Sequence, residues 1–297
     1  MEIDRRVYSL ILVVVVAVLG IILLSTLGNQ LAALVGDAAD SKKYVRVDSA
    51  ADLFAVMDEK LYEFTEEIDL EAPSHDEFVS YWNELNDDFA IHSMFHDRNV
   101  KFEYKEANGK CKIRLIMPLN ACGLAMKHLY MGKGKDYDTP EAAEVGEKLL
   151  SISKEIITDK MSDEEKVKAI HNYIITNYRY AVSGNILDYS ECAVLFKEGQ
   201  AQCQAYTEAF VSLCLLNGVE ARAVSGHSTF GYGETAHAWA IVKLGNFWYH
   251  VDVTWDDPIP DEPGMIRYDF YLKGDFTMEY THDWSDYFQE CAVDYAG

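Results

Sequence analysis

The sequence predicts an α+β protein that is preceded by a membrane-spanning helix, and three patterns carry this prediction. Residues 7–36 contain no charged side chain. Further along the chain, several segments repeat apolar residues at the spacing of an amphipathic helix. Two pairs of segments alternate between apolar and polar residues, and each pair is joined by a short turn that contains glycine. Such pairs are typical of antiparallel β-hairpins, so the chain combines helices with antiparallel strands.

The composition narrows the functional classes. Of the 297 residues, 49% are hydrophobic and 25% are charged, as in a globular protein. Lys and Arg number 26 against 49 Asp and Glu, which argues against a nucleic-acid partner because phosphate binding requires clustered basic residues. The six cysteines include no Cys-x-x-Cys pair, so neither a small disulfide scaffold nor a zinc ribbon fits. Cys111 and Cys122 could pair in an oxidising compartment. We expect no metal site and no cofactor.

Residues 1–36 are predicted to be a cytoplasmic tip and a transmembrane anchor. The apolar run is long enough to cross a hydrocarbon core, which takes about 20 residues. Arg5 and Arg6 precede the run, and Asp37 follows it. The positive-inside bias therefore predicts a single-pass membrane protein with a cytoplasmic N-terminus and an extracytoplasmic remainder. The alternative is a cleaved signal peptide, which would yield a secreted protein, but the best cleavage site, at residues 36–38, is poor.

Residues 37–135 are predicted to form an acidic helical region with one β-hairpin. A short polar stalk at residues 37–45 opens this region, and Asn108-Gly109 is a hairpin signal between two alternating segments. The acidic excess is interpreted as a solvated face, and nothing in the region carries recognisable chemistry. The predicted elements are two helices, at about residues 53–64 and 76–89, and a hairpin at residues 100–117.

Residues 136–297 are predicted to form a second domain after a turn-rich boundary. Ser162 and Glu165 have the spacing of a capping box, which marks the start of a helix. A later run with helical spacing begins after Cys203 and stops at Asn217-Gly218. The predicted helices cover residues 141–158, 162–178 and 204–217.

Cys203 is the first candidate for chemistry. A thiol in the first turn of a helix faces unpaired N–H groups and the positive end of the helix dipole, and both favour the reactive thiolate. Gly199, just upstream, would let the backbone approach closely. Taken alone, a cysteine is more often a small buried hydrophobic residue than a nucleophile.

A predicted hairpin supplies the partners that a nucleophile needs. A two-residue turn at 245–246 pairs residues whose numbers sum to 491, so that His237 lies opposite Thr254 and has Asp252 as its diagonal neighbour on the same face. A histidine base oriented by a carboxylate needs only a nucleophile, and Cys203 is the best placed one. The predicted strands cover residues 235–243 and 247–255.

These residues lie within a segment, from about residue 160 to 284, that resembles the transglutaminase-like superfamily, whose core is shared with papain-fold cysteine enzymes. The chain is similar in particular to bacterial, membrane-anchored proteins with such a domain. The matching stretches occur in the family's order and are GQAQCQAYTEAF (199–210), GVEARAVSGH (218–227), HAWAIV (237–242), WYHVDVTWDDP (248–258) and YDFYLKGDFTMEYTHDW (268–284).

The resemblance implies an α+β papain-like core in which the cysteine helix packs on an antiparallel sheet. It also implies that Cys203 is the nucleophile, His237 the base and Asp252 the residue that orients the base. Two positions depart from the family's pattern. Ala205 stands where glycine is common and Ala240 where asparagine is common, and either could reshape the cleft.

Four further residues are candidates for contacts with the reacting groups. Gln200 and Gln202 could assist the backbone N–H of Cys203 in holding an oxyanion. Trp239 could line the cleft, and His250 could face the substrate. Structural packing is the alternative for both.

These patterns predict a thiol-dependent acyl-transfer enzyme that acts on protein or peptide amide bonds through a thioester. Hydrolysis by a protease or amidase is favoured over protein crosslinking by a transglutaminase, because water is always available at an exposed site. The expected partners are a protein or peptide substrate, such as one at the cell surface, and the membrane that holds the anchor. The alternative is a non-catalytic extracytoplasmic binding module that retains the fold, since a fold alone does not establish an activity.

Overall fold

The computed structural model describes residues 44–87, 94–97, 99–107, 109–133, 137–183, 190–229, 235–262 and 264–296. The predicted anchor lies outside these ranges and stays a prediction. Among the helices that are described, none has both the length and the apolar character needed to cross a membrane.

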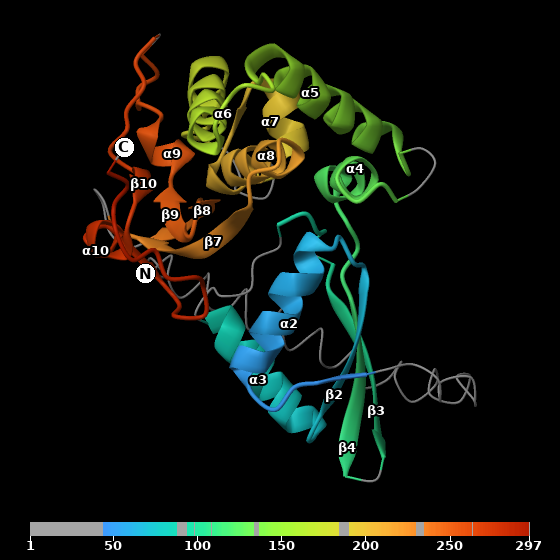
Figure 1. Cartoon of the computed structure of the whole chain (residues 1–297). Helices are drawn as coiled ribbons and strands as arrows, with labels where there is room; N and C mark the ends of the chain where they lie inside the picture. Colours follow the sequence, from blue (N-terminus) through green and yellow to red (C-terminus); the bar gives the residue numbers. More distant parts are fainter. Residues whose placement is uncertain are drawn as a thin grey trace, which may run out of the picture.

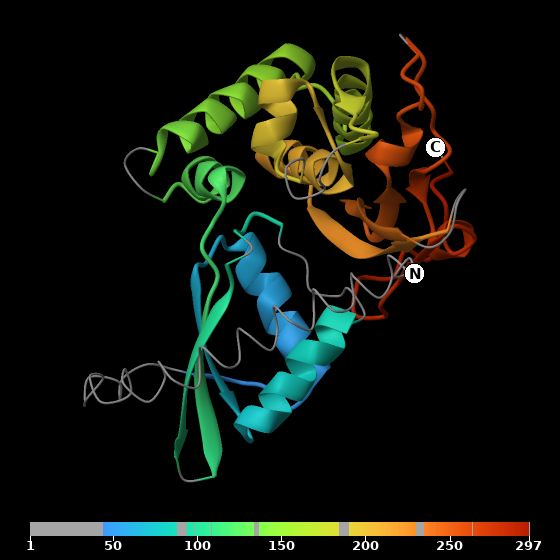
Figure 2. The same cartoon turned by 180° about the vertical axis from the view of Figure 1, so that it is seen from behind.

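Two large β-sheets organise the described chain (Figures 1 and 2), and a third, two-stranded sheet pairs β5 with β6. The N-terminal sheet has the strand order β1-β2-β4-β3, and helices α2 and α3 share a hydrophobic core with it. Its elements are β1 (Val45–Arg46), α2 (Ala50–Tyr62), β2 (Glu67–Ala72), α3 (His75–Asp87), β3 (Lys101–Ala107) and β4 (Lys110–Ile116).

Local sequence signals explain most of this N-terminal unit. Helix α2 begins after Ser49, whose side chain accepts a hydrogen bond from the N–H of Asp52. The predicted helices and the β3–β4 hairpin are confirmed. Strand β2 was not predicted, because acidic residues alternate with its apolar ones and its sequence, EIDLEA, reads as part of the acidic stretch. The apolar positions that β2 buries are Ile68, Leu70 and Ala72.

The C-terminal sheet is antiparallel throughout, with the order β10-β9-β8-β7-β11. Five helices gather on one side of it (Figure 1). The helices are α4 (Ala121–Leu129), α5 (Pro140–Ile156), α6 (Asp163–Asn177), α7 (Cys192–Glu198) and α8 (Cys203–Leu216). The strands are β7 (Ala221–Ser228), β8 (Thr235–Leu244), β9 (Phe247–Val251), β10 (Tyr271–Lys273) and β11 (His282–Trp284). Smaller elements are β5 (Arg179–Tyr180), β6 (Gln200–Ala201), α9 (Val253–Asp256) and α10 (Asp275–Met278).

Helix α8 is the centre of the larger core. It buries every residue from Ala205 to Leu215, as expected of a helix that other elements surround. The face of the sheet that packs on α8 carries alanines, including Ala223 and Ala240. Because these side chains are small, the helix can lie close to the strands. The predicted α+β class, with the cysteine helix packed on an antiparallel sheet, is confirmed.

The other face of the C-terminal sheet packs on the N-terminal unit. Val224, Trp239 and Ile241 belong to the same core as α2, and β7 lies between α8 and α2 in Figures 1 and 2. Tyr62 of α2 accepts a hydrogen bond of 2.6 Å from the N–H of Ala223. The sheet is therefore covered on both faces.

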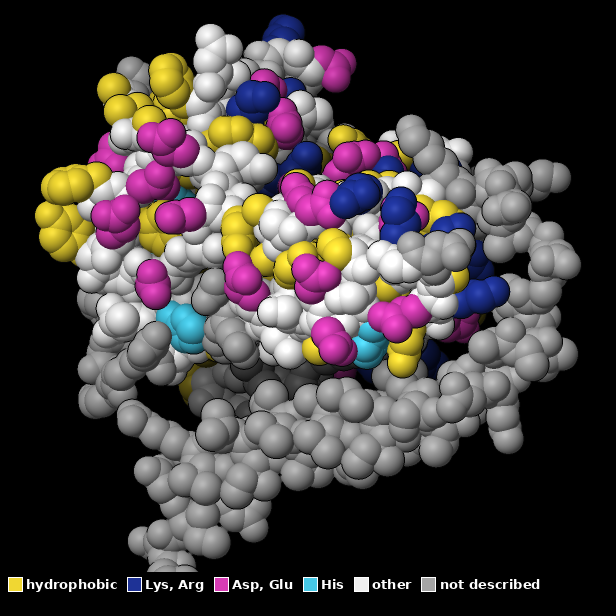
Figure 3. Space-filling view, turned by 90° about the horizontal axis from the view of Figure 1, so that it is seen from below, with side chains coloured by type: hydrophobic (Ala, Val, Ile, Leu, Met, Phe, Trp, Pro, Cys, Tyr) yellow, Lys and Arg dark blue, Asp and Glu magenta, His cyan; other side chains and the backbone are white. Residues whose placement is uncertain are grey.

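The acidic excess lies largely on the surface. Asp and Glu side chains are scattered over the face shown in Figure 3 and do not gather in one cluster there. This distribution agrees with the interpretation of the acidic charge as solvated.

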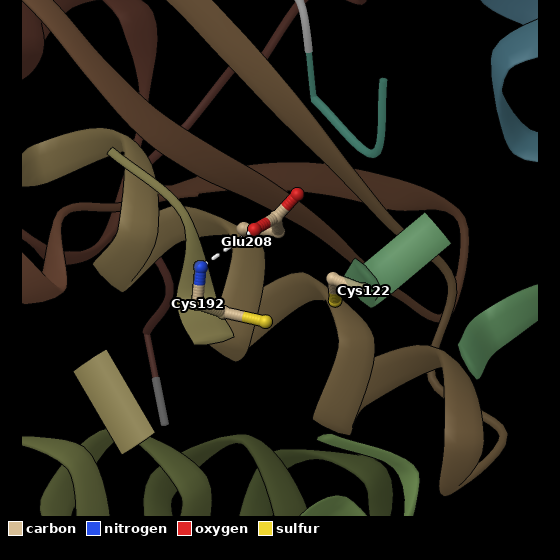
Figure 4. Close-up of side chains that lie close together, drawn as sticks. All are labelled: Cys122, Cys192 and Glu208. Atoms are coloured by element: carbon tan, nitrogen blue, oxygen red, sulfur yellow. Dashed lines mark hydrogen bonds between the residues drawn. The ribbon is translucent and has the colours of Figure 1, made fainter. Parts of the chain in front are cut away.

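Four of the described acidic residues are buried: Glu208, Asp252, Asp256 and Asp257. Of these, Glu208 joins three segments to α8. Glu208 accepts hydrogen bonds from the N–H of Phe95 at 2.9 Å, the side-chain amide of Asn120 at 2.8 Å and the N–H of Cys192 at 2.7 Å. Figure 4 shows the last of these bonds, with the thiols of Cys192 and Cys122 beside it. Because Phe95 and Asn120 lie in the N-terminal half of the chain, Glu208 ties that half to the cysteine helix.

All six cysteines are free thiols. Cys111 lies on β4 in the core of the N-terminal unit, whereas Cys122 lies on α4 in the core around α8. The suggested pairing of these two cysteines is therefore wrong, and the thiol that lies near Cys122 is that of Cys192.

We predict that Glu208→Ala lowers the free energy of unfolding by about 3 kcal/mol or more, because three buried N–H donors lose their acceptor at about 1–3 kcal/mol each. Urea denaturation followed by tryptophan fluorescence measures this loss. Glu220→Ala is the control, since Glu220 is exposed and its described ion pair, with Lys243, lies at the surface. Equal losses in the two variants would contradict the role given to Glu208.

Candidate active site

Cys203 is the first residue of α8, and Gln202 is the cap that precedes it. Helix α7 ends at Gly199 in a left-handed conformation with φ of 71°, and this turn sends the chain through β6 to Cys203. A Cβ atom on Gly199 would meet no atom within 4 Å, so the expected close approach of backbone there is wrong. Glycine is favoured at this position because of its positive φ.

His237 on β8 connects Cys203 to Asp252. Its Nε2 atom lies 2.7 Å from Oδ2 of Asp252, and its ring is hydrogen-bonded to the thiol of Cys203. Since Nε2 is engaged by Asp252, Nδ1 is the nitrogen left for the thiol. The backbone N–H of Ala238 also bonds the sulfur. Cys203 is 7% exposed and His237 8%, whereas Asp252 is fully buried.

The predicted hairpin register is confirmed, but the predicted position of Asp252 in it is wrong. Strands β8 and β9 pair Ala240 with Val251, as the turn at 245–246 requires. Strand β9 then ends, and Asp252 becomes the N-cap of α9, where its Oδ1 accepts hydrogen bonds from two backbone N–H groups. Aspartate favours this capping position over the middle of a strand. Thr254, which was expected opposite His237, lies in α9, and the strand partner of His237 is Gly226 on the other side of β8.

The charges of the three side chains stabilise one another. Burial would raise the pKa of Cys203, but the hydrogen bond and positive charge of His237 outweigh burial and lower it. Burial would lower the pKa of His237, but the charge and hydrogen bond of Asp252, together with Cys203, raise it to about 10. Burial would likewise raise the pKa of Asp252, but His237 and then His282 hold it well below the usual range. These directions favour a thiolate, an imidazolium and an ionised carboxylate at neutral pH.

Two residues beside this group were not predicted from the sequence. His282 of β11 places its Nε2 atom 3.1 Å from the same Oδ2 of Asp252. Tyr180 of β5 lies near Cys203 and Asp252: burial and then the charges of these two residues raise the pKa of Tyr180 to about 12. His282 falls within a stretch that carries the family resemblance, which was the one available signal for it, and no local pattern marks Tyr180.

Trp239 and His250 have structural partners. Nε1 of the buried Trp239 donates to Nδ1 of His250 at 2.9 Å, and Nε2 of His250 donates to Asp275 at 2.8 Å. The ring of Trp239 also stacks on that of His237, with 5.7 Å between centroids. For both residues the structure therefore favours packing over contact with the substrate.

The two glutamines differ in their positions. Gln200 is exposed on β6, three residues before Cys203. Gln202 adjoins Cys203, but its side-chain N–H₂ donates to the carbonyl of Ala181 at 3.3 Å. Neither side chain has a described hydrogen bond to Cys203, so their oxyanion role stays a prediction.

We predict that iodoacetamide alkylates Cys203 at a nearly constant rate from about pH 7 to 9, because its lowered pKa keeps the thiolate populated there. In His237→Ala the largest contributions that offset burial are lost, so the pKa of Cys203 rises to ~8.5 or above and the rate at pH 6 falls on the order of 100-fold. Mass spectrometry of the alkylated peptides over a pH series measures both rates.

Cys214, buried on the same helix, is the internal control. Burial raises its pKa, so it should react slowly at every pH in both proteins. A common pH profile for Cys203 in wild type and His237→Ala would contradict the ion pair.

Part of the chain is similar to known proteins. Residues 150–253 match the model of the family described as "Transglutaminase-like superfamily". The kyphoscoliosis peptidases of Homo sapiens and Mus musculus are each 28% identical to the chain, over 118 and 124 residues. These matches cover 36% and 38% of this chain but only 18% and 19% of the relatives, so the chain spans less than one fifth of their length. A solved structure, "Crystal structure of a TGase", aligns with a TM-score of 0.33 and 17% identity, covering 64% of this chain and 51% of the other.

The segment matched by the family model begins within α5 and ends directly after Asp252. It contains Cys203, His237 and Asp252, together with the whole of α8 and the β8–β9 hairpin that positions them. This part of the chain belongs to the transglutaminase-like superfamily.

Proposed function

We propose that the protein is a thiol-dependent acyl-transfer enzyme in which Cys203 is the nucleophile, His237 the acid and base, and Asp252 the residue that orients His237. The observation that carries the proposal is the hydrogen-bonded series from Cys203 through His237 to Asp252 at the start of a helix. Both the helix start and the imidazolium favour the thiolate, the form that attacks.

In the proposed reaction, Sγ of Cys203 attacks the carbonyl carbon of an amide, and the π electrons move onto the carbonyl oxygen. The backbone N–H of Cys203, at a helix start where N–H groups lack intrahelical partners, can donate to this oxyanion. The hydroxyl of Tyr180 is a second candidate donor, because its raised pKa keeps it protonated.

His237 then completes the first half of the reaction. Its Nδ1–H protonates the leaving amine, the C–N bond breaks, and a thioester to Cys203 remains. Asp252 holds the opposite nitrogen, so the ring keeps Nδ1 towards the sulfur. In the second half, His237 takes a proton from the incoming nucleophile, which attacks the thioester and releases the thiolate.

We favour water as that nucleophile. The relatives that match in sequence are named peptidases, which supports hydrolysis of a peptide or side-chain amide. A primary amine in place of water would give transamidation by the same steps. We also retain the proposal that residues 1–36 anchor the enzyme and place its catalytic domain outside the cytoplasm.

We predict that proteins and peptides from the cell surface, incubated with the enzyme, acquire new chain ends or deamidated glutamines that mass spectrometry detects. Cys203→Ser should abolish these products because, at neutral pH, a serine hydroxyl is a far weaker nucleophile than the thiolate of Cys203. Cys214→Ser, which changes a buried thiol of the same helix, should retain them. Crosslinks in place of cleavage would indicate transamidation, and identical results for wild type and Cys203→Ser would favour the binding module.

For the anchor, we predict that the mature protein keeps its N-terminus and stays with the membrane fraction in high salt, because a membrane-spanning helix is not released by charge screening. N-terminal sequencing and fractionation measure this. A mature N-terminus near Ala39, with the protein in the medium, would show secretion instead.

A further inference from the structure

The carboxylate of Asp252 has all of its acceptor positions occupied. Its Oδ1 accepts from the N–H groups of Thr254 at 3.0 Å and Trp255 at 3.1 Å. Its Oδ2 accepts from Nε2 of His237 at 2.7 Å and Nε2 of His282 at 3.1 Å. Because a carboxylate offers about four lone-pair positions, it cannot turn without losing one of these bonds. His282 is therefore the second of two histidines that fix Oδ2.

The ring of His282 is held in place by its surroundings. The side chain is fully buried, and its ring centroid lies 4.8 Å from those of both Trp239 and Trp255. The edge strand β11 pairs with β7, with His282 opposite Ser228. The ring thus reaches Asp252 from a part of the fold that is separate from the β8–β9 hairpin.

The proton on His282 is also fixed at one nitrogen. An ionised Asp252 only accepts hydrogen bonds, so Nε2 of His282 carries a proton. The other nitrogen, Nδ1, lies 2.9 Å from the hydroxyl of Thr281. That hydroxyl can donate to a neutral ring or accept from a charged one, so His282 donates to Asp252 in both states.

We propose that His282 is a positioning residue. Its Nε2–H holds Oδ2 of Asp252 against Nε2 of His237 and so keeps the opposite ring nitrogen, Nδ1, directed towards Cys203. The kinetic part of this inference rests on the function proposed above. The geometric part does not, because alkylation of Cys203 can report it without a substrate.

The midpoint pH of Cys203 alkylation distinguishes a positioning role of His282 from a purely electrostatic role and from a purely structural one. If His282 positions Asp252, its loss leaves Oδ2 free to turn away from His237. The imidazolium form of His237 is then less stable, and the midpoint of Cys203 alkylation moves to higher pH. If His282 only competes with His237 for the negative charge of Asp252, its loss strengthens the attraction between Asp252 and the imidazolium of His237. The midpoint of Cys203 alkylation then moves to lower pH. A purely structural role leaves the midpoint unchanged. The titratable groups that face Asp252 are His237, His282, Cys203, Tyr180, His250 and Asp256.

The test compares His282→Met, which removes the donor at similar volume, with His282→Gln, whose amide can restore it. In His282→Met we expect the midpoint to rise by about one pH unit and kcat for the cleaved peptide to fall about 10- to 100-fold with KM little changed. In His282→Gln both should return most of the way to wild type. His96→Met is the matched control, because the buried His96 is likewise held at both ring nitrogens, by the carbonyls of Met94 and Thr65, and it is not among the groups that face Asp252. It should lower thermal stability without moving the midpoint.

A double-mutant cycle shows whether His282 acts through Asp252. In an Asp252→Asn background, His282→Met should change the midpoint and kcat little further, since the carboxylate is already absent. Additive effects, an unchanged midpoint or a shift to lower pH would each overturn the proposal. If Cys203 in the wild type titrates as an ordinary thiol, the proposed function itself fails, and that result is visible before any His282 variant is measured.

Discussion

The buried carboxylate of Asp252 is the group on which the arrangement of the candidate active site depends. A charge without solvent is costly unless it is paired and fully hydrogen-bonded, and Asp252 meets that requirement with four donors from three elements. Strand β9 has to end where it does, α9 has to begin there, and β11 has to lie beside β7. The same bonds that make burial of the charge tolerable also orient His237, so stability and chemistry share one set of contacts.

Much of this site follows from local sequence. The spacing around Cys203 predicts its helix, and the turn at 245–246 predicts the register of β8 and β9, because both depend on short-range periodicity. The contact between His237 and Asp252 was also predicted, although through the wrong element. An aspartate that can cap a helix leaves the strand, and that preference overrode the alternation of residues 247–255.

His282 and Tyr180 could not be found in this way, because tertiary pairing brings them to the site. The approach of β11 to β7 depends on Gly226, where a Cβ atom would lie 2.1 Å from the carbonyl oxygen of Asp283. Likewise, Tyr180 reaches Cys203 through the parallel pairing of β5 with β6. The two departures from the family's pattern have a packing explanation: Ala205 and Ala240 are fully buried between α8 and the sheet, so they shape that contact more than the cleft.

The contacts of Glu208, and the packing of the N-terminal unit on the second face of the C-terminal sheet, limit how short a stably folded fragment of this protein can be. Excision of residues 150–253, the segment that the family model matches, would leave Glu208 with Cys192 as the one donor of its three. It would also expose Val224, Trp239 and Ile241, an apolar patch next to His237 that would promote aggregation. The segment that the family model matches is thus shorter than the part of the chain whose side chains pack together. We expect a fragment that folds to include α2 and the residues that follow it.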